Sequence, residues 1–205
     1  MTLVKICGIT NLEDALAAVE FGADALGFNF YKKSSRYITP QDAEKILEDL
    51  PSSIWRVGVF VNEPEETVVD LSVRLELNYL QFHGDETPYY CEQFAVPYWK
   101  AFPLKDEKIL ELMKKYHCDY FLVDAFVENA YGGTGVTGDW SLAREAKKIG
   151  KIFLAGGLRP NNVSMAIEAV HPDGVDVASG VEVHPGKKDH VKLEEFITNA
   201  RDVLV

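Results

Sequence analysis

A cysteine stands near the start of the chain, where a strand pattern changes into a helix pattern. Residues 2–7 have the β-strand pattern and end in Cys7, Gly8 can turn the chain, and Asn11 is a suitable helix N-cap. Enzymes built as α/β barrels carry their chemistry at such junctions, and a helix N-terminus stabilises the reactive thiolate. A buried structural cysteine is the commoner fate of this residue type. The position nevertheless favours Cys7 as a catalytic thiol.

A carboxylate closes another apolar strand pattern, at residues 119–124. Asp124 could cap a helix or pair with a loop cation, but no helix pattern begins directly after it. If both strands belong to one barrel, Asp124 can face Cys7 across the barrel mouth. A thiol and a carboxyl on opposite sides of one pocket form a base and acid pair.

Three segments that contain glycine follow the last three strand patterns. None of them contains Lys or Arg, and each alone is ordinary turn punctuation. In many barrels, however, the ends of strands seven and eight hold a phosphate group through backbone N–H groups. The sequence therefore predicts a phosphorylated substrate. The expected phosphate-binding residues are Gly133, Thr134, Gly135, Gly156, Gly157, Ser179 and Gly180.

Two further side chains lie in segments that would reach the same rim. Arg36 is in the long segment 31–39, and His83 follows the strand pattern 78–82. A solvated basic loop is the usual interpretation of a residue such as Arg36, and a bidentate clamp for a substrate carboxylate is the alternative. Both interpretations of Arg36 remain open at this point, and Arg36 and His83 are the candidate substrate-binding residues of the rim.

Strand alternation places Lys5 on the same face as Cys7, deeper in the barrel. A buried lysine needs a partner, and Asp176 in the last strand pattern is the candidate. We interpret this pair as structural first and functional second.

The elements that would position these residues form a regular series. Eight apolar runs rich in β-branched and aromatic residues each precede a helical pattern. Eight such units in 205 residues predict a single compact (β/α)8 TIM barrel over residues 1–205, with a doubly wound open sheet as the rival. The expected strands are 2–7, 24–30, 55–61, 78–82, 97–102, 119–124, 151–155 and 174–178.

Composition narrows the class of protein. The net charge of -11 argues against a nucleic-acid or anionic-membrane partner, and no apolar run is long enough to span a bilayer. Three widely spaced cysteines without a CxxC motif, and no leader pattern, fit a reducing cytoplasm. No metal-ligand cluster, dinucleotide fingerprint or Walker loop is present, so neither a metal nor a cofactor is expected.

Taken together, the motifs resemble the phosphoribosylanthranilate isomerase family of tryptophan biosynthesis over nearly the whole chain. Ser35 and Gly138 depart from residues that the family often has at these places, and neither is a reacting group. The motifs that carry the resemblance are residues 5–10, 27–30, 34–36, 81–86, 124 with 132–135 and 139–140, 154–158 with 162–163, and 175–177 with 179–182.

The resemblance implies an isomerase without cofactor, monomeric or homodimeric, that acts on a small phosphorylated aminoaldose. It implies Cys7 as general base, Asp124 as general acid, Arg36 as the anchor for the anthranilate carboxylate, and phosphate on the glycine loops. The reaction would be the Amadori rearrangement of N-(5′-phosphoribosyl)anthranilate to 1-(o-carboxyphenylamino)-1-deoxyribulose 5-phosphate. Two alternatives remain open: another phosphosugar barrel enzyme, and a catalytically silent phosphosugar-binding barrel.

Overall fold

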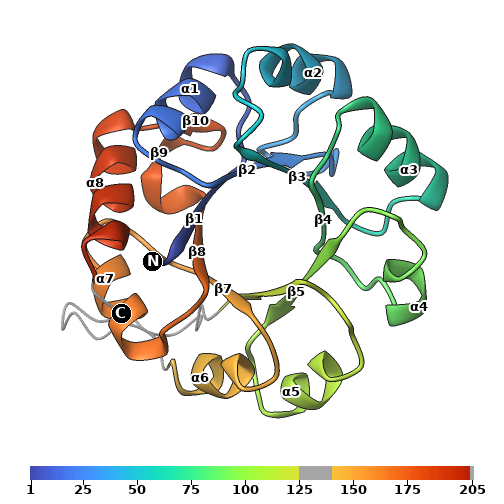
Figure 1. The fold of residues 1–205 in the computed structure, drawn as a ribbon, viewed down its shortest axis with the longest axis vertical. Coiled ribbons are helices and arrows are strands. Elements are labelled where there is room, and N and C mark those ends of the chain that lie inside the picture. Colours follow the sequence, from blue (N-terminus) through green and yellow to red (C-terminus); the bar gives the residue numbers. More distant parts are fainter. Residues whose placement is uncertain (125–139, 204–205) are drawn as a thin grey trace.

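Eight parallel strands close into a barrel in sequence order, and β1 pairs with both β2 and β8 (Figure 1). The computed structural model describes residues 1–124 and 140–203. The predicted barrel is confirmed and the open sheet is wrong, because β1 pairs with β8 and closes the sheet. Every barrel strand begins and ends within one residue of its expected bounds. The strands are β1 (Leu3–Cys7), β2 (Ala25–Asn29), β3 (Trp55–Phe60), β4 (Tyr79–Phe82), β5 (Tyr98–Pro103), β6 (Tyr120–Asp124), β7 (Ile152–Ala155) and β8 (Gly174–Val177).

Helices surround the strands as an outer ring (Figure 1). They are α1 (Leu12–Glu20), α2 (Pro40–Glu48), α3 (Glu65–Arg74), α4 (Pro88–Cys91), α5 (Lys108–Met113), α6 (Ser141–Lys147), α7 (Val163–Val170) and α8 (His190–Arg201). The predicted cap of α1 is confirmed, because the Asn11 side chain accepts a hydrogen bond from the Asp14 N–H. Within the described residues, no helix is long and apolar enough to cross a membrane.

One element between β8 and α8 departs from a simple strand-to-helix loop. A short 3-10 helix, η1 (Ser179–Val181), leads into the antiparallel strands β9 (Glu182–His184) and β10 (Lys187–Lys188). The sequence patterns did not predict this ribbon, because its strands are too short to show a period. It folds back towards α1: the Lys188 backbone N–H donates to Asp14.

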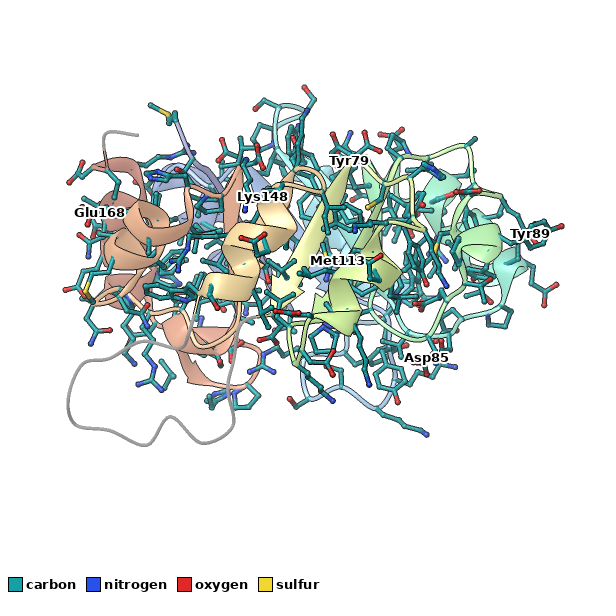
Figure 2. All side chains as sticks on the ribbon, turned by 90° about the horizontal axis from the view of Figure 1, so that it is seen from below. Tyr79, Asp85, Tyr89, Met113, Lys148 and Glu168 are labelled. Atoms are coloured by element: carbon teal, nitrogen blue, oxygen red, sulfur yellow. The ribbon has the colours of Figure 1, made fainter. Side chains whose placement is uncertain are left out.

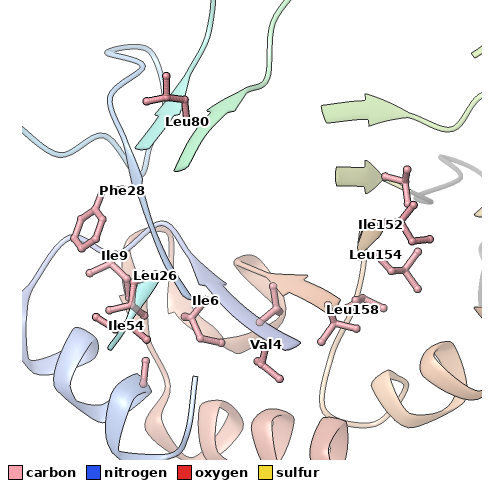
Figure 3. Close-up of a cluster of buried hydrophobic side chains, with 14 of the residues drawn as sticks. Val4, Ile6, Ile9, Leu26, Phe28, Ile54, Leu80, Ile152, Leu154 and Leu158 are labelled. Atoms are coloured by element: carbon pink, nitrogen blue, oxygen red, sulfur yellow. The ribbon is translucent and has the colours of Figure 1, made fainter. Parts of the chain in front are cut away.

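Apolar side chains pack in two separate layers. The outer layer lies between strands and helices and includes Ile6, Leu26 and Leu154 (Figure 3). The inner layer fills the barrel itself with large aromatic residues, among which Trp99 and Phe153 stack with ring centroids 4.3 Å apart.

The inner aromatic residues come from the beginnings of the strands. Trp55, Tyr79 and Tyr120 each open their strand, and Trp99 and Phe153 are second in theirs. Figure 2 accordingly shows Tyr79 near one end of the barrel and Asp85, which follows β4, at the opposite end. The N-terminal half of the barrel is therefore packed with side chains.

Candidate active site

A cavity of about 840 Å³ lies at the C-terminal ends of the barrel strands. Every described site residue that the sequence predicted lines it: Cys7, Arg36, His83, Asp124, Gly156, Gly157, Ser179 and Gly180. The remaining predicted residues, Gly133, Thr134 and Gly135, lie outside the described residues. The closed barrel brings these side chains together because parallel strands present all their carboxyl ends at one face.

Cys7 ends β1 beside β2, in register with Gly27. Burial raises the pKa of the Cys7 thiol, and the neighbouring Lys5 ammonium opposes this shift. The sequence-based expectation of a thiolate favoured by the following helix is therefore wrong in direction. Helix α1 begins only at Leu12, and the Asn11 side chain caps it. The main positive charge that favours the thiolate is the ammonium of Lys5, which lies deeper in the barrel on the same strand.

Lys5 and Asp176 pair inside the barrel, as strand alternation predicted. The two residues are in register on β1 and β8, and Lys5 Nζ donates to Asp176 Oδ1 at 2.5 Å. Burial works to lower the pKa of Lys5, but the negative charges of Asp176 and Cys7 outweigh it and raise the pKa. The lysine side chain is fully buried and stays charged.

Arg36 crosses Gly8 and pairs with Glu182. Its Nε donates to Glu182 Oε1 at 2.9 Å, and its Nη2 donates to Glu182 Oε2 at 2.6 Å. Gly8 has a φ of 74°, and a Cβ there would lie 2.5 Å from Arg36 Cδ, so glycine is required for two reasons. The interpretation of Arg36 as a purely solvated loop residue is wrong, since its side chain is only 23% exposed.

Glu182 also connects Arg36 to the main chain of Cys7. Lys188 Nζ donates to Glu182 Oε1 at 3.0 Å and to the Cys7 carbonyl oxygen at 2.6 Å. Burial lowers the pKa of Lys188 against the opposing pull of Glu182. Burial acts to raise the pKa of Glu182, but its bonds to Arg36 and Lys188 prevail and lower it. The network keeps Glu182 ionised between two cations.

His83 and Asp124 complete the polar wall of the cavity. Gln81 Nε2 lies 3.0 Å from His83 Nδ1, and an amide nitrogen can only donate, so Nδ1 accepts. Burial lowers the pKa of His83, which favours the neutral ring with its proton on Nε2. Asp124 is the last residue of β6, and its backbone carbonyl accepts from the Leu104 N–H.

The loops after β7 and β8 touch each other. Gly156 and Gly157 have φ values of 90° and 64°, which favour glycine. A Cβ on Gly180 would lie 1.9 Å from the Leu158 carbonyl oxygen, so only glycine allows this approach. The result is a strip of exposed backbone on one side of the cavity, of the kind that binds phosphate.

The comparisons with known proteins agree with one another. The family model described as "N-(5'phosphoribosyl)anthranilate (PRA) isomerase" matches residues 4–199. The chain belongs to this family. The N-(5'-phosphoribosyl)anthranilate isomerase of Trichlorobacter lovleyi is 50% identical over 205 residues, which is 100% of both chains.

Solved structures of the isomerase family have the same fold. The crystal structure of the Thermotoga maritima enzyme has 46% identity and a TM-score of 0.89, covering 98% of this chain and 99% of its own. A family structure in complex with reduced 1-(o-carboxyphenylamino)-1-deoxyribulose 5-phosphate has 44% identity and a TM-score of 0.87, with the same coverage. The sequence-based resemblance to the isomerase family is thus confirmed.

The sequence analysis missed three residues that line this cavity or hold its side chains in place. Arg159 also lines it, two positions beyond Gly157, and Glu182 and Lys188 hold Arg36 and Cys7. Arg159 could have been found from its place after the glycine pair. Lys188 had no such signal, and the motif that ends in Glu182 did not show that this carboxylate meets Arg36, because the ribbon β9–β10 was not foreseen.

Proposed function

We propose that this chain converts N-(5′-phosphoribosyl)anthranilate to 1-(o-carboxyphenylamino)-1-deoxyribulose 5-phosphate in tryptophan biosynthesis, the activity for which its family is named. The observation that carries the proposal is the single cavity lined by Cys7, Asp124, Arg36 and the glycine loops of β7 and β8. It combines two groups able to move protons with donors suited to the two anionic ends of that substrate.

The reaction is an isomerisation that transfers protons within the substrate, with no net oxidation or reduction. The Asp124 carboxyl gives a proton to the ribose ring oxygen, the ring opens, and the nitrogen lone pair forms a Schiff base. The cationic imine makes the C2′ proton acidic, and the Cys7 thiolate removes it to leave the enol-amine. Each transfer contributes a rate factor of about 10²–10⁴.

Contacts with the two anionic ends of the substrate keep its C2′ atom next to the Cys7 thiolate. Glu182 takes the Nε side of the Arg36 fork, and the guanidinium's other N–H groups can bind the anthranilate carboxylate. The Nε2–H of His83 suits a sugar oxygen. The phosphate lies on the backbone of Gly156, Gly157, Ser179 and Gly180, next to Arg159. Fixing both ends of the substrate supplies the orientation that the reaction needs.

The placement of the phosphate has a defined alternative at Lys32 and Lys33. Lys32 lines a different hollow, together with Tyr37 and Arg74, and neither lysine lines the main cavity. This separation supports the glycine loops. An anion found at Lys32 and Lys33 in a crystal, with the ends of β7 and β8 empty, would reverse the orientation of the substrate.

Turnover of freshly prepared N-(5′-phosphoribosyl)anthranilate, followed by the loss of its fluorescence, tests the proposal. We expect rapid turnover by the chain as it exists, without added metal or cofactor, and almost none by Cys7→Ser. A folded chain that binds the product analogue but converts no substrate would instead be a silent binding barrel. Light scattering of the same sample distinguishes a monomer from a homodimer, both of which remain predictions.

A further inference from the structure

A buried ion pair at the floor of the cavity, where Asp176 lines it and Lys5 lies below, has no part in the proposed proton transfers. Lys5 is fully buried and Asp176 is nearly so. Their neighbours in the inner layer are mostly apolar, and Lys5 Nζ lies 5.8 Å from the centre of the Trp99 ring. A buried ion pair is often no more stabilising than well-packed apolar residues of the same volume. Stability alone therefore does not explain a lysine at this position.

Glycine at position 27 brings the Lys5 ammonium and the Cys7 thiol together. Gly27 lies beside Cys7 in the neighbouring strand β2. A Cβ at this position would be 2.8 Å from Cys7 Sγ and 3.0 Å from Lys5 Nζ. The sulfur and the ammonium thus both border the space that any larger residue at position 27 would fill, and the charge of each acts on the other.

Charged and titratable groups face Cys7 from several elements. The ammonium of Lys5 lies below the sulfur on β1, and the carboxylate of Asp176 lies next to it on β8. The remaining groups around the thiol are Lys188 on β10, Arg36 and its partner Glu182, His83 after β4 and Asp124 on β6. Lys5 is the cation with the strongest effect on the sulfur, and it opposes the effect of burial.

We propose that Lys5 is a positioning residue for Cys7: its ammonium stabilises the thiolate by a charge-assisted hydrogen bond, and Asp176 holds the ammonium in place. This inference rests on the proposed function, in which Cys7 is the base. Asp176 keeps Lys5 charged after the thiolate has taken the C2′ proton, because the lysine then still has a counter-ion. The pair therefore supports both protonation states of the thiol without giving up a proton itself.

Alkylation of Cys7 by iodoacetamide between pH 7 and 11 tests the inference without any turnover. Only the thiolate reacts, so the rate at Cys7, identified in its peptide by mass spectrometry, reports the thiolate fraction. We expect Lys5→Met to move the midpoint upward by at least about one pH unit, which slows alkylation about tenfold below the midpoint. In turnover, kcat should fall by a similar factor while KM changes little.

A matched control is available in the same barrel. Lys100 on β5 is also buried and pairs with Glu86 at 3.2 Å, but it does not line the cavity. Lys100→Met should leave the Cys7 midpoint unchanged. If it shifts the midpoint as far as Lys5→Met does, the effect is general loosening of the barrel and the inference is wrong.

Two further variants keep the test decisive if Lys5→Met does not fold. Lys5→Met with Asp176→Asn removes both charges and leaves no buried carboxylate unpaired; because Asp176 itself raises the Cys7 pKa, this double variant is compared with Asp176→Asn, against which it should raise the midpoint. Gly27→Ala keeps both charges but separates the sulfur from the ammonium, and should also raise the midpoint. The inference is overturned if Gly27→Ala leaves the Cys7 midpoint within about 0.3 pH units of the parent, or if the double variant leaves it within about 0.3 pH units of Asp176→Asn. Normal midpoint shifts in a chain without isomerase turnover would refute the proposed function and leave the action of Lys5 on the thiol intact.

Discussion

Glu182→Gln removes one negative charge from the network that holds Arg36 and keeps the shape of the side chain. Glu182 accepts from Arg36 Nε and Nη2 and from Lys188 Nζ, and its side chain is 4% exposed. An amide offers one acceptor oxygen in place of two, and its NH₂ group faces cations. The variant therefore leaves Lys188, which is fully buried, with the Cys7 carbonyl oxygen as its main partner.

The cost follows from how deeply each cation lies. Removing one partner of a buried ion pair typically costs about 3–5 kcal/mol of unfolding free energy. Arg36 is 23% exposed, so water can solvate it in part and reduces this cost. We expect a loss of about 2–4 kcal/mol. Because Arg36 also loses its support, KM should rise about tenfold, equivalent to about 1.4 kcal/mol.

Urea unfolding as a function of pH measures this loss and checks its origin. The folded-state pKa of Glu182 is lowered, so its contribution is present above the unfolded-state pKa, about 4.3, and is lost as the pH falls through the folded-state pKa. The gap in stability between parent and Glu182→Gln should therefore be full at pH 7 and close below about pH 4. A gap smaller than about 0.5 kcal/mol at pH 7, or one that does not narrow in acid, would refute the reasoning.

The remaining predictions concern the reacting groups and the phosphate loops. Cys7→Ser should fold normally, bind product analogues as the parent does and lose at least about 10²-fold in kcat; a variant with more than about a tenth of the parent kcat would exclude Cys7 as the base. Asp124→Asn should lower kcat rather than KM and remove one limb of the pH–rate profile; an unchanged profile would indicate another proton donor. Arg36→Met should weaken product analogues that carry the carboxylate more than those that lack it, as measured by calorimetry; equal losses would show that Arg36 does not contact this group. Gly180→Ala places a Cβ 1.9 Å from the Leu158 carbonyl oxygen, so it should weaken phosphate-bearing ligands far more than dephosphorylated ones; equal losses of affinity for both kinds of ligand would show that the phosphate does not bind at these loops.

The regular part of the fold could be predicted from the sequence because strand and helix periods are properties of short segments. Strand alternation even paired Lys5 with Asp176, two residues 171 positions apart, since a fixed period sets which face each side chain occupies. The same rule placed Cys7 and Asp124 at the strand ends that meet around one cavity.

The interactions of loops could not be predicted in the same way. Arg36 was expected to meet a substrate carboxylate, but the pattern gave no indication that Glu182, 146 positions away, already accepts from its fork. The direction of the Cys7 pKa shift also escaped prediction. It depends on burial by the closed barrel and on one ammonium, and neither can be read from residues 2–16 alone.

The paired cations explain how a strongly acidic chain can bind a substrate with two anionic ends. Lys5 and Arg36 beside the thiol are each matched by a carboxylate, Asp176 or Glu182. In the described part of the chain, Arg159 is the arginine of the cavity without an ion-pair partner, and it lies next to the glycine loops. A cation that is paired with a carboxylate can still orient a ligand or a thiolate in direct contact with it, but it attracts anions from a distance only weakly. Because the net charge is -11, the substrate's anionic groups are recognised only by groups in direct contact with them. These groups are the backbone N–H groups of the glycine loops and the N–H groups of Arg36 that Glu182 does not occupy.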